Sequence, residues 1–393
     1  MAEKHFDIVI AGGAMAGATL ALALSKFCDK TLSIAVIEPY QVDSNEHPGF
    51  DSRSIALSYG TTQILEAFGL WEQLLPDATP INTIHVSDKG HAGMTDIDSR
   101  DYGVQALGYV VELANVGRVY QHCIEQSSNI EFICPDSVAS IDSQQHVTRI
   151  TLESGNVIEC ALLVAADGAV SECCRLMKID NQQVDFEQVA VIANIGVSQL
   201  HQDRAFERFT PNGPLALLPM SQNRMSLVWC LSADKAEQMM SATEDDFISE
   251  LQSEFGWRLG AISHVGSRAS YPLILHKKSQ ITAHRFATIG NAAQALHPIA
   301  GQGFNLGNRD VASLAEEISL SADPGSYETL SRYQKRRDAD RNSTIDLTAG
   351  LVHIFSNEWL PMVVGRNLSL MAMDNIPALK SPLLNRTMGL VKR

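Results

Sequence analysis

The feature that most constrains this chain is a strand, a glycine turn and a helix near its start, in DIVIAGGAMAGATLALALSK (7–26). A short β-branched strand ends at Ala11, and an Ala- and Leu-rich helix begins near Met15. A second strand of the buried type, LSIAVI (32–37), ends at Glu38. This order predicts a βαβ unit, which requires a parallel sheet with a right-handed crossover. The expected fold class is therefore α/β.

The turn itself predicts a dinucleotide-binding site. Its glycines are Gly12, Gly13 and Gly17, and Ala14 stands where the second glycine of G-x-G-x-x-G belongs. Backbone N–H groups and the helix N-terminus would face a pyrophosphate, and Glu38 would suit a ribose hydroxyl. The alternative is a tight strand–helix turn that binds nothing. Because Ala14 adds a methyl group, we expect the dinucleotide to be held less tightly than by three glycines.

Three later segments carry further candidate binding residues. Arg53 opens an expected helical stretch after a Pro-Gly turn, where it either reaches a phosphate or is a plain surface arginine. A buried strand (161–166) delivers Asp167 and Gly168 to the carboxyl edge of the sheet, where ligands bind in α/β folds. Asp-Gly is also a common turn pair. A long glycine loop, GNAAQALHPIAGQGFNLG (290–307), leads into a helix and would bring backbone close to a flat ring.

Composition excludes several classes of function. The chain has 393 residues, of which 45% are hydrophobic and 19% charged, so it is expected to form a large core rather than a disordered chain. A net charge of −15 argues against nucleic-acid binding. Seven scattered cysteines without C-x-x-C predict reduced thiols in the cytoplasm. The histidines show no metal-ligand spacing, so no metal site is expected.

Alternation of strand-like and helix-like segments predicts interleaved domains. We expect a nucleotide-binding domain from 1–80, 111–183 and 281–330. An antiparallel, strand-rich domain is expected from 81–110 and 184–280, and a helical region from 331–393 would follow.

The helical region carries two notable patches. One is a basic cluster that we interpret as a solvated helix face, formed by Arg332, Lys335, Arg336, Arg337 and Arg341. The other is the Met- and Leu-rich stretch from Leu351 to Leu390, which suits contact with a membrane or a partner protein, or a helical cap on the fold.

Together these motifs resemble the flavoprotein aromatic hydroxylases that share the p-hydroxybenzoate hydroxylase fold. The run GNAAQALHPIAGQGFN is the most specific, and HPGFDSRSIALS, YVVELANVGR and RAFERFTPNGPLALLPM resemble members that act in ubiquinone biosynthesis. The likeness covers nearly the whole chain. It implies a glutathione-reductase-type, Rossmann-like FAD-binding domain interleaved with an antiparallel-sheet substrate domain, and a helical C-terminus.

The resemblance also implies which residues bind FAD. The first turn would hold the pyrophosphate, and the long glycine loop would line the flavin ring. The full set is Gly12, Gly13, Ala14, Ala16, Gly17, Glu38, Arg53, Arg118, Asp167, Gly168, Asn291, Pro298, Gly301, Gly303, Phe304 and Asn305. Asn291 stands where the family usually has Asp, so it keeps an oxygen acceptor without the charge, and its hydrogen bonds should be weaker.

The activity implied by the resemblance is hydroxylation of the ring of a polyprenylated methoxyphenol in ubiquinone biosynthesis. NAD(P)H would reduce FAD, and O2 would react through a flavin C4a-hydroperoxide. The substrate would be a prenylated phenol. The resemblance therefore also implies that the protein contacts the inner face of the membrane peripherally, and that it contacts other ubiquinone-biosynthesis proteins. The chain lacks a second G-x-G-x-x-G and a C-x-x-x-x-C pair, which fits transient NAD(P)H binding.

A base that takes the phenol proton would assist this reaction, and His297 and Tyr271 are the candidates by position and type. A loop histidine bonded to backbone is the alternative for His297. Two other functions remain open for the chain as a whole. One is a different flavin-dependent oxidoreductase, and the other is a flavin-poor scaffold or lipid carrier in a ubiquinone-synthesis complex.

Overall fold

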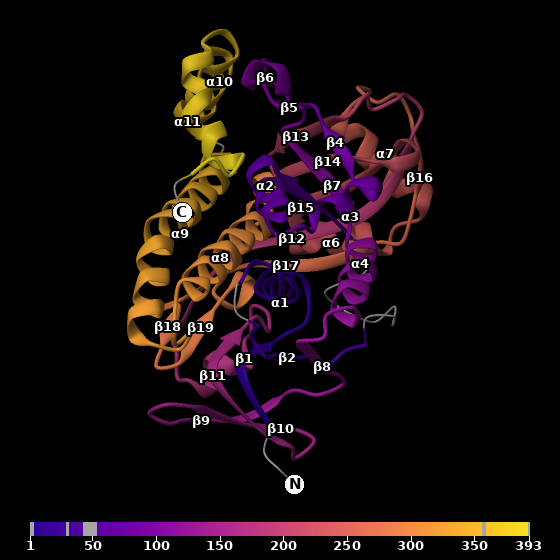
Figure 1. Cartoon of the computed structure of the whole chain (residues 1–393). Coiled ribbons are helices and arrows are strands. Elements are labelled where there is room, and N and C mark those ends of the chain that lie inside the picture. Colours follow the sequence, from indigo (N-terminus) through magenta and orange to yellow (C-terminus); the bar gives the residue numbers. More distant parts are fainter. Residues whose placement is uncertain (1–3, 29–30, 42–52, 356–358, 392–393) are drawn as a thin grey trace.

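The computed structural model describes residues 4–28, 31–41, 53–355 and 359–391 (Figure 1). Within these ranges the first sheet has the strand order β18-β19-β11-β1-β2-β8, and β9 and β10 extend it beside β11. Strands β19, β11, β1, β2 and β8 run parallel. The strands are β1 (Lys4–Ala11), β2 (Ile34–Ile37), β8 (Ile130–Ile133), β9 (Val138–Ser143), β10 (Thr148–Leu152), β11 (Val157–Ala165), β18 (Thr282–Ala283) and β19 (Phe286–Thr288).

Both faces of this sheet are covered, as in other parallel sheets. Ile8 and Ile10 point to one apolar core, whereas Val9 and Ala11 point to another, because side chains alternate along a strand. The first core lies under α1 (Met15–Phe27), α4 (Leu113–Glu125) and α8 (Gln302–Ser319), and the second lies against β9, β10 and the short helix α5 (Glu172–Leu176). The βαβ prediction is confirmed. Strand β8 continues the parallel sheet beside β2, whereas β9 pairs with β10.

A small antiparallel sheet, β3-β7-β4, joins the two larger ones. Its strands are β3 (Ser54–Ser58), β4 (Thr79–Ile81) and β7 (Gly108–Glu112), and the adjacent helices are α2 (Tyr59–Ala67) and α3 (Trp71–Leu74). The expectation that Arg53 opens a helix is therefore wrong. Residues 54–58 pair with β7, and Ser58 caps α2 by accepting a hydrogen bond from the Thr61 N–H. The Pro-Gly turn before Arg53 lies outside the described residues.

The second large sheet carries the strand order β20-β17-β12-β15-β14-β13-β5-β6, with β16 beside β12. Its pairs are antiparallel except β5 with β13. One face packs on α6 and α7 around Trp229 and Phe247. The elements are β5 (Thr83–Asp88), β6 (Met94–Asp98), β12 (Asn181–Val197), β13 (Arg204–Thr210), β14 (Gly213–Met220), β15 (Arg224–Ser232), α6 (Ala233–Ser241), α7 (Glu244–Phe255), β16 (Ile262–Val265), β17 (Ala269–Lys278) and β20 (Gln294–Ala295).

Three helices complete the described chain: α9 (Tyr327–Phe355), α10 (Leu360–Asn375) and α11 (Pro377–Thr387). Helix α9 packs along α8, and α10, yellow in Figure 1, lies beside β6. The interpretation of the basic cluster as a solvated face is wrong for two of its members, because the side chains of Arg337 and Arg341 are buried. None of the helices in the described ranges is both long and apolar enough to cross a membrane. The 3₁₀ helices are Leu75–Asp77, Ser99–Tyr102, Ser221–Asn223, Gly290–Ala292 and Ile299–Gly301.

Candidate active site

The predicted binding motifs meet at the carboxyl ends of β1, β11 and β19. Gly12 has φ +101°, and a Cβ placed on it would lie 2.4 Å from the carbonyl oxygen of Ala166, the residue before Asp167. A Cβ on Gly290 would lie 2.9 Å from the Cβ of Ala16. The turn after β1, the Asp-Gly loop and the start of the long glycine loop therefore pack directly against one another. This is the sheet edge at which α/β folds bind ligands.

Close approach of backbone explains the glycines of the first turn. A Cβ on Gly17 would lie 1.9 Å from the carbonyl oxygen of Gly12, so the helix cannot start here with any side chain at that position. The Gly13 N–H donates to Oε2 of Glu38 at 2.6 Å. Ala14 has φ −72° and precedes α1 without a side-chain cap. Since this φ is ordinary for alanine, the methyl group in the motif position adds no backbone strain.

Glu38, Arg53 and Arg118 have different surroundings. Glu38 is buried, and its carboxylate also accepts from the Tyr40 N–H at 3.0 Å. The Arg53 guanidinium lies 5.1 Å above the ring of Tyr271. Arg118 is exposed on α4 and donates to a neighbouring asparagine of the same helix. Tyr271 is 39% exposed and does not line the cavity described below, so its placement gives no support to the prediction that it takes a substrate proton.

Asp167 has one carboxylate oxygen engaged and one unused. Oδ2 accepts from the Cys173 N–H at 3.0 Å. Oδ1 is buried and has no hydrogen-bond partner within the described ranges. Gly168, with φ +88°, turns the chain immediately afterwards. A buried carboxylate oxygen without a partner calls for a ligand or water. Together with the uncapped start of α1, it makes a binding edge whose donors and acceptors fit FAD.

The long glycine loop ends in a second uncapped helix. Gly301, with φ +59°, precedes α8, whose first N–H groups receive no side-chain cap. The Asn305 side chain is fully used inside the protein. Its Oδ1 accepts from the Ser58 N–H at 2.8 Å and the Thr61 hydroxyl at 2.7 Å, and its Nδ2 donates to the carbonyls of Ala56 and Gly301. Asn305 therefore fixes the loop against β3 and α2, which leaves the backbone amides of the helix start for a cofactor.

His297 is a buried loop histidine. Its Nδ1 accepts from the Ile299 N–H at 3.2 Å, and its Nε2 lies 3.1 Å from Oε1 of Gln188. These partners assign the proton to Nε2. Burial lowers the pKa of His297 to about 4, so the ring is neutral at physiological pH. Both nitrogens are engaged, which favours the alternative of a structural histidine over a base.

A buried ion-pair network holds the start of the glycine loop. Asp310 of α8 accepts from the Gly290 N–H at 3.2 Å, from Nε2 of Gln294 at 2.7 Å and from Nε of Arg337 at 2.7 Å. Arg341 donates to Oε1 of Gln294 at 2.7 Å. Sequence reasoning missed this network. The signal was present, because residues 337, 340 and 341 have the spacing of one helix face.

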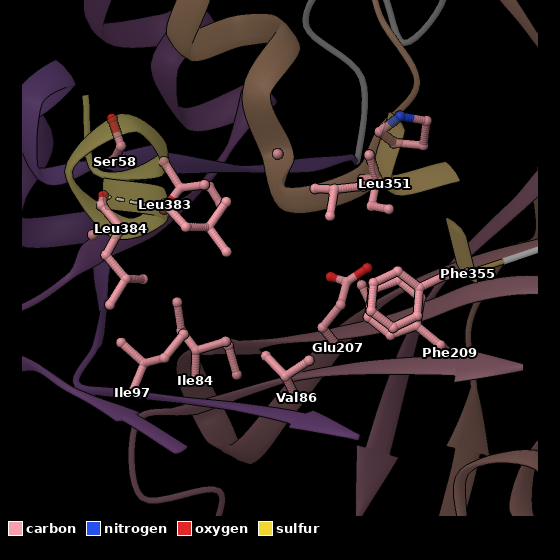
Figure 2. Close-up of a pocket in the computed structure, with 18 of the residues that line it drawn as sticks. Ser58, Ile84, Val86, Ile97, Glu207, Phe209, Leu351, Phe355, Leu383 and Leu384 are labelled. Atoms are coloured by element: carbon pink, nitrogen blue, oxygen red, sulfur yellow. Dashed lines mark hydrogen bonds between the residues drawn. The ribbon is translucent and has the colours of Figure 1, made fainter. Parts of the chain in front are cut away.

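A cavity of about 800 Å³ lies between the second sheet, the glycine loop and the C-terminal helices. The predicted residues Asn291, Pro298, Gly301, Gly303, Phe304 and Asn305 line it, whereas the first turn does not. Figure 2 shows its largely apolar wall. The side chains drawn there include Ile84, Val86, Phe209, Leu351, Phe355 and Leu384.

Glu207 of β13 is the functional candidate that sequence reasoning missed. Figure 2 shows its carboxylate among the apolar side chains of the cavity. Across the described ranges, the Glu207 carboxylate makes no hydrogen bond or ion pair. Two other charged residues line the cavity with partners: Arg366 is 2.9 Å from Asp88, and Lys380 donates to a backbone carbonyl. Burial raises the pKa of Glu207 to about 7. Strand alternation through AFERF would have indicated that residues 205, 207 and 209 share a face.

Comparison with known proteins agrees with this geometry. The family described as FAD binding domain matches residues 5–348. Ubiquinone hydroxylase UbiL of Rhodospirillum rubrum is 31% identical over 100% of this chain and 91% of its own length. The 3-demethoxyubiquinol 3-hydroxylase of Escherichia coli is 30% identical over 99% of this chain and 100% of its own.

Solved structures show the same fold at lower identity. The p-nitrophenol 4-monooxygenase PnpA from Pseudomonas putida has a TM-score of 0.81 at 17% identity, with 98% of each chain covered. PqsL of Pseudomonas aeruginosa has a TM-score of 0.79 at 19% identity, with 94% of this chain and 100% of PqsL covered. The expected fold class is thereby confirmed. This chain belongs to the FAD-binding-domain family and, within it, to the flavin-dependent aromatic monooxygenases that include the ubiquinone hydroxylases.

Proposed function

We propose that this protein uses FAD, NAD(P)H and O2 to hydroxylate the ring of a polyprenylated methoxyphenol on the route to ubiquinone. The observation that carries the proposal is the apolar cavity of about 800 Å³, which adjoins the glycine loop and is lined on another side by the C-terminal helices. A cavity of this size and character suits a phenol with a hydrocarbon chain. The relatives named as ubiquinone hydroxylases support the same substrate class.

FAD, when bound, supplies the chemistry that activates oxygen. The turn from Gly12 to Gly17, Glu38 and Asp167 would hold its dinucleotide part, since they form the sheet edge with uncapped backbone amides and an unused carboxylate oxygen. Pro298 and the start of α8 line the cavity, so they would hold the end that faces the substrate. The remaining contribution of the protein is to orient the ring and to exclude water.

The C-terminal helices are proposed to cover the prenyl chain. Leu351, Leu370, Met373, Leu384 and Met388 all line the cavity from α9, α10 and α11 or just beyond α11. Burial of a hydrocarbon chain against such a lining contributes about 25 cal/mol per Å² of apolar surface.

We also propose that the protein is cytoplasmic and contacts a membrane peripherally, and the outer side of the same region supports that contact. Trp359 and Leu360 are 66% and 72% exposed, and Leu368 on α10 is 60% exposed. Apolar side chains that protrude beside a cavity for a lipid-like substrate suit contact with a membrane surface or with other ubiquinone-biosynthesis proteins.

The interleaved division into domains is also a proposal. The first large sheet draws its strands from segments 4–37, 130–165 and 282–288, and the second draws most of its strands from 83–98 and 181–278. This membership supports an FAD-binding domain from 1–80, 111–183 and 281–330 with a substrate domain from 81–110 and 184–280.

The test uses purified protein and a 6-methoxyphenol that carries a short prenyl chain at position 2. We expect flavin absorbance, NAD(P)H oxidation stimulated by this phenol, and a product heavier by one oxygen atom in mass spectrometry. As a control, Ala216→Trp should fill the cavity floor, keep the flavin and abolish hydroxylation.

Two outcomes would contradict the proposal in different ways. Protein that takes up no FAD on titration would support the scaffold or lipid-carrier function instead. Protein that binds FAD but releases only hydrogen peroxide with every prenylated phenol would retain the oxidoreductase class and exclude this substrate class.

A further inference from the structure

The floor of the cavity is one row of neighbouring residues across four strands. In register, Val86 of β5 faces Glu207 of β13, Glu207 faces Ala216 of β14, and Ala216 faces Val228 of β15. All four line the cavity. Three of them are small or apolar, so the carboxylate of Glu207 is the polar group in an otherwise hydrocarbon row. Its neighbour Ala216 leaves space beside it for a ring.

In the part of the chain that the structure describes, the charged and titratable groups near this carboxylate are either paired with other groups or neutral. On β5, Asp88 pairs with Arg366 of α10 at 2.9 Å. On β15, Cys230 is buried, and burial together with the charge of Glu207 raises the pKa of this thiol. In the glycine loop, His297 is neutral.

Two further cations near the cavity are bonded elsewhere. Lys380 of α11 donates to the Asp96 carbonyl at 2.7 Å. Arg208, the next residue on β13, lies on the opposite strand face and donates to the Glu254 carbonyl. No cation in the described ranges therefore neutralises Glu207, and its partner must come from what enters the cavity.

We propose that Glu207 is the catalytic base that binds the phenolic hydroxyl of the substrate and takes its proton. The inference rests on the proposed function, because it requires a phenol in the cavity. As the ring attacks oxygen, the phenolic O–H bond breaks, its electron pair stays with the ring oxygen, and the proton bonds to the carboxylate. The hydroxylated ring carbon then releases its hydrogen to solvent as a proton. Glu207 returns its own proton to the ring oxygen and ends as a carboxylate. O2 and NAD(P)H supply the oxidant and the reductant through FAD.

The protonation state of Glu207 suits this task. Burial raises its pKa to about 7, so carboxylate and carboxylic acid are both populated near neutral pH. A base is most effective when its pKa lies near the working pH, and such a group contributes roughly a hundred- to ten-thousandfold to the rate.

The first experiment compares wild type with Glu207→Gln, which keeps the shape and removes the basic oxygen. In wild type, hydroxylation should fall about tenfold per pH unit below pH 7, because protonated Glu207 cannot accept a proton. Glu207→Gln should lower the rate roughly a hundredfold or more and lose this limb of the pH profile. Glu207→Asp should retain the fall of the rate at acidic pH, with a lower rate of hydroxylation than wild type. Glu237→Gln, which removes an exposed carboxylate on α6, is the matched control and should behave as wild type.

The second experiment does not depend on turnover. Calorimetry at pH 6.5 in buffers of different ionisation enthalpy measures proton release when the prenylated 6-methoxyphenol binds to the FAD-loaded protein. Hydrogen bonding to the carboxylate favours its ionised form, so wild type should release about half a proton. The methyl ether of the same phenol, which has no proton to donate, should release none. Glu207→Gln should release none with either compound.

The two proposals fail in distinguishable ways. Equal proton release from wild type and Glu207→Gln, or an unchanged rate and pH limb in Glu207→Gln, would overturn the role of Glu207 and leave the hydroxylase function standing. Proton release that depends on Glu207 in a wild-type protein that makes no hydroxylated product would overturn the proposed function and retain Glu207 as the phenol-binding group.

Discussion

Carboxylates that are partly or fully withdrawn from solvent occur in two regions of this molecule, and their surroundings differ. Between α8 and α9, Asp340 accepts from Nε of Arg309 at 2.8 Å and from Nη1 of Arg337 at 2.7 Å. Burial opposes ionisation of Asp340, but the two guanidinium groups outweigh it and hold the pKa of this carboxyl below its ordinary value. In the cavity, the half-buried Glu207 lies among apolar side chains without a cation, and desolvation raises its pKa instead.

The difference teaches what each region does. The paired acids fix backbone, because Asp310, Asp340 and their arginines connect two helices to the start of the glycine loop. Rigid positioning of that loop is what a cofactor site requires. The unpaired acid faces a cavity and remains available to a ligand. A buried charge without a partner is costly to stability, and such groups concentrate at functional sites.

The largest effect is expected from breaking the paired region. Arg337→Met leaves Asp310 and Asp340 short of a buried cation, so it should destabilise the protein by about 3–5 kcal/mol. Urea unfolding followed by circular dichroism measures this. Lys335→Met, on the exposed side of the same helix, should stay within about 0.5 kcal/mol of wild type. Equal stability of the two variants would show that the network is not needed to hold the loop.

The next effect concerns the tight backbone of the cofactor turn. Gly12→Ala would place a methyl group 2.4 Å from the Ala166 carbonyl at φ +101°, so FAD affinity should fall about thirtyfold or more. Flavin fluorescence titration is the measurement. Gly69→Ala is the matched control: it also has positive φ, +67°, but no atom within 4 Å of the new Cβ. A similar loss of FAD in both variants would mean that general strain, rather than the close approach, causes the effect.

A smaller, pH-dependent effect is expected in the cavity. The folded-state pKa of Glu207 is about 7, above its ordinary value of 4.5, so ionisation opposes folding. The protonated carboxyl therefore contributes fully to the free energy of unfolding below pH 4.5. This contribution is lost as the pH rises to 7. Glu207→Gln should therefore gain about 1–3 kcal/mol relative to wild type at pH 8 and little at pH 4.5, the range allowing for water in the cavity. Thermal unfolding at both pH values tests this, and a gain that is independent of pH would contradict it.

The smallest effect is expected at the one position of the cofactor turn that departs from its motif. Because Ala14 has φ −72°, its methyl group brings no backbone strain, and only crowding of the pyrophosphate remains. Ala14→Gly should tighten FAD by less than about tenfold, which is ~1.4 kcal/mol. The same fluorescence titration measures it. A hundredfold gain would show that alanine obstructs the pyrophosphate far more than its backbone conformation indicates.

The local parts of the fold could be predicted from the sequence. Helix α1 begins at Met15 as expected, and the glycine turn leads from β1 into α1. The cofactor class could be inferred as well. These predictions rest on local signals: hydrophobic periodicity, capping residues and glycines that no side chain could replace. Because such signals act over a few residues, they can be recognised in the sequence without knowledge of tertiary contacts.

Tertiary structure alone decided the rest. Helix is the expectation for residues 54–58, but they form a strand because they pair with β7, about fifty residues later in the chain. Arg337 of α9 looks like part of a solvated face until Asp310 of α8 packs against it and accepts its hydrogen bond. Glu207 looks like an ordinary strand residue until β5, β14 and β15 surround it with hydrocarbon. The physical reason is common to all three: pairing, burial and pKa depend on neighbours that are distant in sequence, and these are set only when the sheets and helices pack.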